Sequence, residues 1–202
     1  MSFFFDFNGN NTFDAGIDFF PVFEAIGPDG VDGFANSGAA TNDVADAPFG
    51  PQLGSWFLRQ PIPGTVPPPF IIDYNTLQII TGLSGEIWDI DGGINMGGTL
   101  VTEQWNVEVL DVAGTPLVPA LLSPLGNNQS LDGRPWTLAF SGLPSGVDKI
   151  RITFVGSKQG GLGLAFNNFS PTFPVPEPCA TALMAIAIGS VCGCSRRQRS
   201  RE

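Results

Sequence analysis

The C-terminal stretch constrains this chain more than any other feature. The 18 residues from Pro178 to Ser195 carry no charged side chain. As a helix they would span roughly 27 Å at about 1.5 Å per residue, which is close to the thickness of a bilayer's hydrocarbon core. We therefore expect a membrane-spanning helix over residues 179–195. The alternative is a buried core helix followed by a basic surface tail.

A cluster of arginines follows this run directly. Its members are Arg196, Arg197, Arg199 and Arg201. Such clusters stay on the cytoplasmic side of a membrane, because carrying guanidinium groups across the hydrocarbon core is costly. The arginines would therefore anchor the helix from the cytoplasm, with the rest of the chain on the opposite side of the membrane.

A proline-rich motif precedes the apolar run. It consists of Val175, Pro176, Glu177 and Pro178. This motif, a short spanning helix and a terminal arginine cluster, in that order, resemble the PEP-CTERM sorting signal of exported bacterial proteins. The resemblance covers residues 175–202 and implies an exosortase as partner, a membrane-embedded protease that cuts such tails near the motif. It also implies a location in the bacterial inner membrane in transit, and afterwards at the cell surface or in the extracellular matrix.

The residues before this signal are strongly acidic. Residues 1–173 contain 17 acidic and five basic side chains, a formal net charge of −12. A surface of this charge repels nucleic acid, so we expect no nucleic-acid partner. The chain has no histidine, which excludes Ser-His-Asp and Cys-His triads and histidine zinc sites. Its three cysteines all lie beyond residue 178, so a hydrophobic core must hold the preceding domain together.

The N-terminus shows no secretion signal. Met1 to Asp6 has neither a basic region nor an apolar run long enough for a signal peptide. Because the arginine cluster requires the acidic domain to lie outside the cytoplasm, we expect the signal peptide to lie upstream of Met1.

Short alternating segments fill residues 1–173. Trp105, Val107 and Val109 alternate with polar residues, as the inward-facing side chains of a strand do, and Ile150 and Ile152 repeat the pattern. About ten such segments, separated by glycine- and proline-rich turns, predict an all-β fold, an antiparallel β-sandwich, and their number favours a jelly roll. One of these strands is expected over Ile17–Ile26, and no helix is expected before Cys179.

Residues 84–169 also resemble the carbohydrate-binding jelly-roll bodies that often accompany such sorting signals. This second resemblance implies extracellular polysaccharide as a ligand. Where those bodies have Phe-Asp-Asn near the end, this chain has Phe166, Asn167 and Asn168, which removes a charge that a metal site there would use. We accordingly divide the chain into a β-sandwich domain over residues 1–173 and a sorting signal over residues 174–202.

Oxygen-bearing side chains gather at three places along the domain, a pattern compatible with Ca²⁺, which prefers six to eight oxygen ligands. The candidate ligands are Asp6, Asn8, Asp89, Asp91, Asn167 and Asn168. Because the first and last strands of a jelly roll lie together, the first pair would meet the last pair. The alternative is that these residues make turns by hydrogen-bonding their own backbone.

Tryptophans and carboxylates allow two further interpretations. Three of the four tryptophans fall at inward positions, so core packing is favoured over stacking on sugar rings. These tryptophans are Trp56, Trp88, Trp105 and Trp136. A glycosidase needs two carboxylates at a set separation, and sequence spacing does not fix that distance. The two candidate pairs are Glu86 with Asp89 and Glu103 with Glu108.

These observations predict an exported, non-enzymatic surface or matrix protein whose sandwich domain binds a ligand, with extracellular polysaccharide as the expected class. One alternative is a glycan-active enzyme that uses a carboxylate pair on the same scaffold. Another is a structural adhesin with neither a pocket nor an exposed aromatic row.

Overall fold

A computed structural model of the chain describes residues 1–26, 45–62, 65–75, 78–95, 97–126, 131–159, 162 and 165–174. The strands are β1 (Ser2–Phe5), β2 (Val22–Ala25), β3 (Trp56–Arg59), β4 (Phe70–Asp73), β5 (Gly82–Ile90), β6 (Gly92–Ile94), β7 (Leu100–Thr102), β8 (Trp105–Leu110), β9 (Leu121–Leu122), β10 (Leu131–Ser141), β11 (Lys149–Phe154) and β12 (Ala165–Thr172). A single-turn helix, α1 (Gly50–Leu53), precedes β3. The described part of the chain is therefore all-β apart from this turn.

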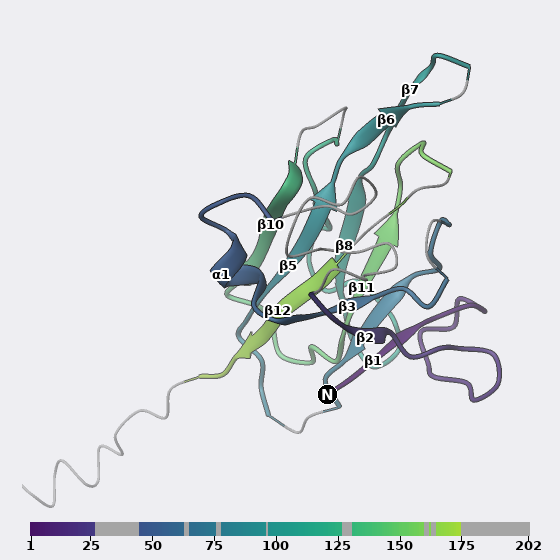
Figure 1. Cartoon of the computed structure of the whole chain (residues 1–202). Coiled ribbons are helices and arrows are strands. Elements are labelled where there is room, and N and C mark those ends of the chain that lie inside the picture. The colour runs from purple at the N-terminus through teal and green to yellow at the C-terminus, as the bar shows by residue number, and fades with distance from the viewer. Residues whose placement is uncertain are drawn as a thin grey trace, which may run out of the picture.

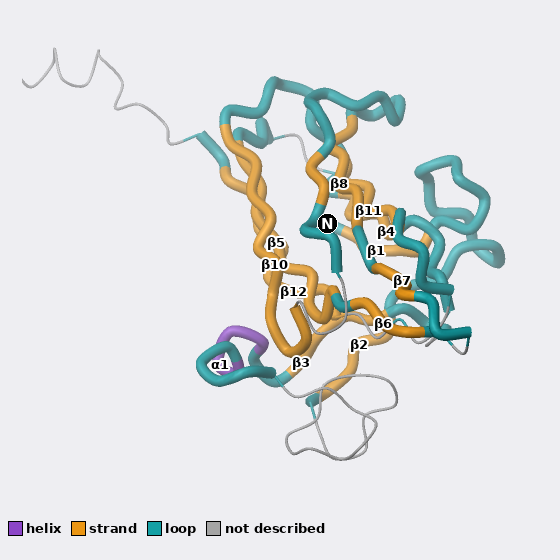
Figure 2. Tube along the Cα trace, turned by 90° about the horizontal axis from the view of Figure 1, so that it is seen from above, coloured by secondary structure: helices purple, strands orange, loops and turns teal. Residues whose placement is uncertain are grey.

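Two five-stranded sheets make up the body of the molecule (Figure 1). The first, which we call the β8 sheet, has the order β1-β4-β11-β8-β9, and the second, the β5 sheet, has the order β10-β5-β12-β3-β2. Each pair of neighbouring strands runs antiparallel. Figure 2 shows the sheets as two layers, with α1 outside the layer that contains β5. This arrangement is consistent with the expected β-sandwich.

The main core fills the space between the two sheets. Trp105, Val107 and Val109 of β8 are fully buried and contact Ile87 and Leu138 of the opposite sheet through one continuous cluster. The alternation along β8 predicted this inward face correctly, because successive side chains of a strand point to opposite sides. Burial of each such side chain contributes about 1.5–3 kcal/mol, so this cluster is the main source of the fold's stability.

A second, smaller core lies on the outer face of the β5 sheet. Leu53 of α1 packs there against Phe57, Trp88 and Ala165. Phe57, Trp88 and Ala165 each lie next in the sequence to a residue that packs in the main core. Because successive side chains of a strand point to opposite faces, the two cores use opposite faces of the same strands. The single turn of α1 covers this apolar patch, which would otherwise face water.

Two expectations need correction or completion. The strand expected over Ile17–Ile26 is confined to β2, because Asp18 accepts hydrogen bonds from the N–H groups of Phe7 and Asp14 and holds the preceding residues in a loop. Within the described ranges, which end at Pro174, no helix is both long and apolar enough to cross a membrane. The predicted helix over residues 179–195 lies outside those ranges.

Candidate functional site

An aromatic cleft opens where the two sheets end side by side. It has a volume of about 330 Å³ and draws its lining from β1, β2, β3 and β12. The lining residues are Phe3, Phe23, Leu58, Phe166, Asn167, Asn168 and Phe169. Because β1 and β2 are the edge strands of their sheets, no further strand closes this end of the sandwich among the described residues. The inner faces of the sheets therefore reach solvent here through aromatic side chains.

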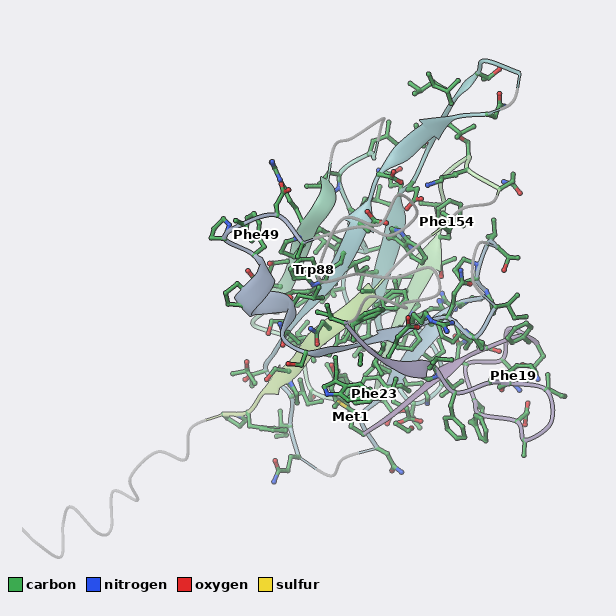
Figure 3. The ribbon with its side chains drawn as sticks, in the orientation of Figure 1. Met1, Phe19, Phe23, Phe49, Trp88 and Phe154 are labelled. Atoms are coloured by element: carbon green, nitrogen blue, oxygen red, sulfur yellow. The ribbon has the colours of Figure 1, made fainter. Side chains whose placement is uncertain are left out.

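A pair of exposed rings stands at this edge. The rings of Phe23 and Trp56 have centroids 5.2 Å apart and planes only 7° from parallel. Phe23 is 65% exposed and Trp56 is 50% exposed, which is unusual for large apolar side chains that have a core to enter. Phe23 can be followed on β2 in Figure 3, well separated from the buried Trp88. The strand register explains the pairing, because Phe23 lies opposite Leu58 and Ala25 lies opposite Trp56 on one face of the hairpin.

Two asparagines of β12 form the polar rim of the cleft. Asn167 donates from Nδ2 to the carbonyl oxygen of Leu53 at 2.7 Å, and Asn168 donates from Nδ2 to that of Gln52 at 3.1 Å. Asn168 takes a positive φ of 54° at an irregularity in the β12–β5 pairing, which turns its side chain toward α1. Both side chains are thereby fixed by α1, so the rim is ordered before any ligand arrives.

Glu86 supports the rim of the cleft through hydrogen bonds. Its Oε2 accepts hydrogen bonds from Asn168 Nδ2 at 2.9 Å and from Trp88 Nε1 at 3.0 Å. Its Oε1 accepts a hydrogen bond from Gln52 Nε2 at 2.6 Å. Glu86 is only 6% exposed, and these three neutral donors satisfy its carboxylate. Glu86 is therefore placed as a structural anchor that joins α1 to β5 and β12.

The carboxylate pairs considered for catalysis are engaged separately. Glu108 accepts a hydrogen bond from Arg151 Nε at 2.8 Å in the β8 sheet, whereas Glu103 lies 2.7 Å from Lys158. Glu86 has the partners given above, and Asp89 is buried at a positive φ of 62° near the end of β5. Neither pair lines the aromatic cleft.

The six predicted calcium ligands have partners in different parts of the molecule. Asp6 is 1% exposed, and its two oxygens accept hydrogen bonds from the N–H groups of Gly9 and Asn11, both at 2.7 Å. Asn8 donates to Asp14 in the same loop. These contacts agree with the turn interpretation. Asp91 pairs with Lys158, Asn167 and Asn168 donate to α1, and Asn168 also donates to Glu86. The described residues contain no group of three acidic side chains placed to hold a metal ion, and calcium binding stays a prediction.

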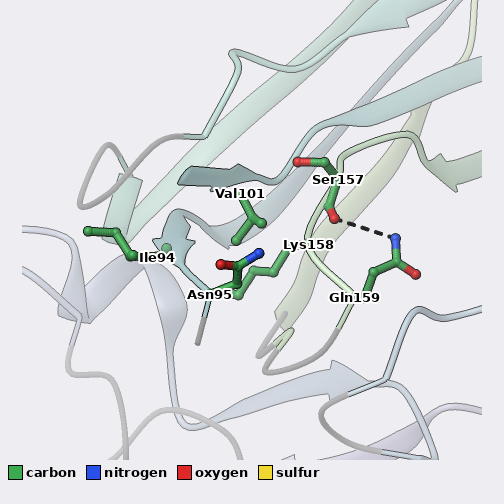
Figure 4. A pocket seen from close by; sticks show the side chains of 7 residues that line it. Ile94, Asn95, Val101, Ser157, Lys158 and Gln159 are labelled. Carbon is green, nitrogen blue, oxygen red and sulfur yellow. Dashed lines mark hydrogen bonds between the residues drawn. The ribbon is translucent and has the colours of Figure 1, made fainter. Parts of the chain in front are cut away.

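A charged cluster lies beside a second cavity, beneath the β6–β7 hairpin. The cavity has a volume of about 280 Å³, and Figure 4 shows Lys158 among its lining side chains, beside Asn95. Lys158 Nζ contacts both Asp91 and Glu103. Burial raises the pKa of Glu103 to about 8, despite the opposing effect of the lysine. Sequence reasoning did not single out this lysine, because no local spacing connects it to its two partners.

The sorting residues lie outside the described ranges. These are Val175, Pro176, Glu177 and Pro178, followed by the anchor residues Arg196, Arg197, Arg199 and Arg201. Comparison with known proteins found no family model that matches this chain and no curated protein that matches it. The candidate site therefore has to be interpreted from its own geometry.

Proposed function

We propose that this chain is an exported, non-enzymatic bacterial protein whose β-sandwich binds extracellular polysaccharide at the aromatic cleft. The single observation that carries the binding proposal is the exposed, nearly parallel pair of Phe23 and Trp56 beside an open cleft. Flat aromatic faces contact the C–H faces of sugar rings, and a few fixed polar groups then set orientation. Asn167 and Asn168 supply such groups at the rim.

The charge of the domain narrows the ligand class. Residues 1–173 carry a formal net charge of −12, which repels acidic polysaccharides at long range. The lining of the cleft contains no charged side chain to offset this repulsion. We therefore assign a neutral polysaccharide as the ligand.

The delivery part of the proposal rests on the C-terminal sequence. A helix over residues 179–195 would hold the protein in the inner membrane in transit, and an exosortase would cut near Val175 to Pro178. We classify the domain as jelly-roll-like, a choice supported by the chain's path, because β3, β4, β5, β8, β10, β11 and β12 belong alternately to the two sheets.

The glycan-active enzyme is the weaker candidate. Three of its four candidate carboxylates, those of Glu86, Glu103 and Glu108, contact other side chains, and the aromatic cleft has no acidic residue in its lining. A non-catalytic binding role needs only the exposed rings and the fixed rim, both of which are present.

Binding is tested by affinity electrophoresis of the full-length chain in mild detergent. Native gels containing dextran, laminarin or hydroxyethylcellulose serve as probes. We expect retardation in at least one gel, and Trp56→Ala and Phe23→Ala should each weaken it about tenfold. Phe20→Ala is the matched control, because Phe20 is 61% exposed but lies outside the cleft. Equal retardation of the wild type and Trp56→Ala, or none in any gel, would reject the proposal.

Sorting is tested separately in an exosortase-carrying bacterium that expresses the chain behind a signal peptide. The mass of the recovered protein should show cleavage near Glu177, and Glu177→Ala should leave the tail uncut. An uncut wild-type protein that ends at Glu202 in the soluble cytoplasmic fraction contradicts the sorting proposal and leaves the binding proposal standing.

A further inference from the structure

The charged cluster beneath the β6–β7 hairpin joins side chains from three strand ends. Lys158 Nζ lies 2.8 Å from Asp91 Oδ1 and 2.7 Å from Glu103 Oε1. The side chain of Glu103 is fully buried, and neither of its oxygens has a hydrogen bond of normal geometry in the described part of the chain, although Oε1 contacts the lysine. A buried ion pair is stabilising only when its remaining lone pairs are also satisfied, and those of Glu103 are not. Such a group calls for a chemical role.

We propose that Lys158 and Asp91 condense to an intramolecular amide, with Glu103 carrying protons between them. The Nζ lone pair attacks Cγ of the protonated Asp91 carboxyl, and the Nζ–Cγ bond forms. The Cγ–OH bond then breaks, and the hydroxyl leaves as water with a proton that Glu103 returns. In balance, one ammonium and one carboxylate give one amide and one water, without oxidant, reductant or further reactant.

The backbone holds the three groups in place. The N–H of Glu103 donates to the carbonyl oxygen of Asp91 at 3.1 Å, and the N–H of Lys158 donates to that of Thr102 at 3.0 Å. Gly156 permits this close approach, because a Cβ there would lie 2.3 Å from the Thr102 oxygen. Fixed neighbours react with effective concentrations of about 10⁵–10⁸ M, which offsets the unfavourable condensation of an acid and an amine in water.

Protonation states suit these roles. Burial lowers the pKa of Lys158, but its contacts with the Asp91 and Glu103 carboxylates together raise it by more, so the ammonium is the resting form. Burial raises the pKa of Glu103 to about 8, so near neutral pH its carboxyl is protonated and can give its proton to the Asp91 carboxylate. The Glu103 carboxylate left by that transfer then accepts a proton from Lys158, which frees the amine. The Asp91 side chain is 26% exposed, so the water that it loses has a way out.

The bond would close the chain from residue 91 to residue 158. A cross-link of this kind stabilises a domain as a disulfide does, chiefly by restricting the unfolded chain. The domain before the sorting signal has no cysteine, so a disulfide is not open to it. We expect the amide to raise the Tm by roughly 10 °C.

Intact mass spectrometry of the full-length chain, purified in mild detergent, tests the proposal. The wild type should be lighter than its sequence mass by one water, and tandem spectra should join the peptides of Asp91 and Lys158. Lys158→Arg, Asp91→Ala and Glu103→Gln should each restore the full mass. Asp91→Asn should still condense, but with loss of ammonia, which shows the electrophile directly even if Glu103→Gln fails to fold.

Two controls distinguish the proposed amide from other reactions that lose water. Lys149→Arg removes the other lysine of the chain and should leave the loss of water and the Tm unchanged. Because Asp91 precedes Gly92, a succinimide would also lose water, but it would persist in Lys158→Arg. Full mass in the wild type, a loss of water that survives Lys158→Arg, or a bond from Lys158 to Glu103 would each overturn the proposal. None of these outcomes bears on polysaccharide binding.

Discussion

Two buried glutamates in this molecule have opposite surroundings. Glu86, on the outer face of the β5 sheet, is 6% exposed and accepts hydrogen bonds from three neutral donors. Glu103, between β7 and β8, is fully buried, faces the cation of Lys158 and keeps an oxygen without a hydrogen bond among the described residues. The charge of Glu86 is stabilised by the fixed dipoles of its three donors. Glu103 depends instead on its ion pair with Lys158 and on its own protonation state.

The different surroundings of the two glutamates indicate different roles, structural for Glu86 and chemical for Glu103. Glu86 fixes Asn168 and α1, and through them the rim of the aromatic cleft. Glu103 has a raised pKa and an amine within contact distance, a combination on which the proposed amide chemistry depends. Both residues lie in the same fold, so burial alone does not decide what a glutamate does.

The largest expected effect comes from removing the cation beside Glu103. Lys158→Ala takes the cation from the partly buried Asp91 carboxylate and also prevents the proposed amide, and breaking a buried pair typically costs about 3–5 kcal/mol. We expect the free energy of unfolding, measured by urea titration at pH 7, to fall by about that amount. A loss as small as that of an exposed ion pair would contradict the placement of Glu103 in the interior.

The pH dependence of stability sharpens the same contrast. The pKa of Glu103 is raised from 4.5 to about 8, so the folded state keeps a proton that the unfolded state releases. The associated stability is fully present below the unfolded pKa and is lost as pH rises through the folded pKa, a loss of a few kcal/mol between about pH 5 and pH 8. Urea unfolding across this range should show the decline in the wild type and a flatter profile in Glu103→Gln. Parallel profiles would refute the raised pKa.

A smaller effect is expected at Glu86. Glu86→Ala removes the acceptor for three donors, which costs about 2–3 kcal/mol, whereas Glu86→Gln keeps one acceptor oxygen and should cost about 1 kcal/mol. Because Asn168 loses its support, polysaccharide binding should weaken in Glu86→Ala although Glu86 does not line the cleft. Unfolding titrations and affinity electrophoresis of both variants measure the two consequences. Unchanged polysaccharide binding by a folded Glu86→Ala variant would contradict the proposed support of Asn168 by Glu86.

The smallest change in stability is expected at an exposed ion pair, which serves as the baseline for the buried ones. Arg134 pairs with Asp46, and their side chains are 55% and 44% exposed. An exposed ion pair contributes about 0–1 kcal/mol, so Arg134→Ala should scarcely change the urea midpoint. A loss comparable to that of Lys158→Ala would mean that burial does not distinguish the two ion pairs.

The all-β class and the long strands were predictable because their information is local. Val107 and Ile152 alternate with polar neighbours, and this period follows directly from strand geometry. Simple alternation does not hold where one residue changes the backbone. Asp89, at a φ of 62°, shifts the alternation of β5, so that Ile87 and Ile90 both enter the main core. The helix α1 is a single turn, too short to show a helical period.

The candidate site was less predictable because it is built from distant segments. Inward periodicity correctly placed Trp105 in the main core, whereas Trp88 is buried in the second core on the outer face of the β5 sheet. The exposure of Trp56 follows from the position of β2 and β3 at the edge of their sheet. The pairing of Phe23 with Trp56 depends on a register between two strands that are far apart in the sequence, β2 and β3. Lys158 meets Asp91 only through the packing of three strand ends, which no sequence spacing records.

The signals of the four tryptophan indoles test the central claim most directly. In a ¹H–¹⁵N spectrum of the full-length chain, each indole gives one N–H peak, and Trp56→Phe identifies that of Trp56. Addition of the polysaccharide that retards the protein in gels should shift the Trp56 peak and leave those of Trp88 and Trp105 in place. A Trp56 peak that stays fixed while the protein is saturated with the polysaccharide would contradict binding at the aromatic cleft.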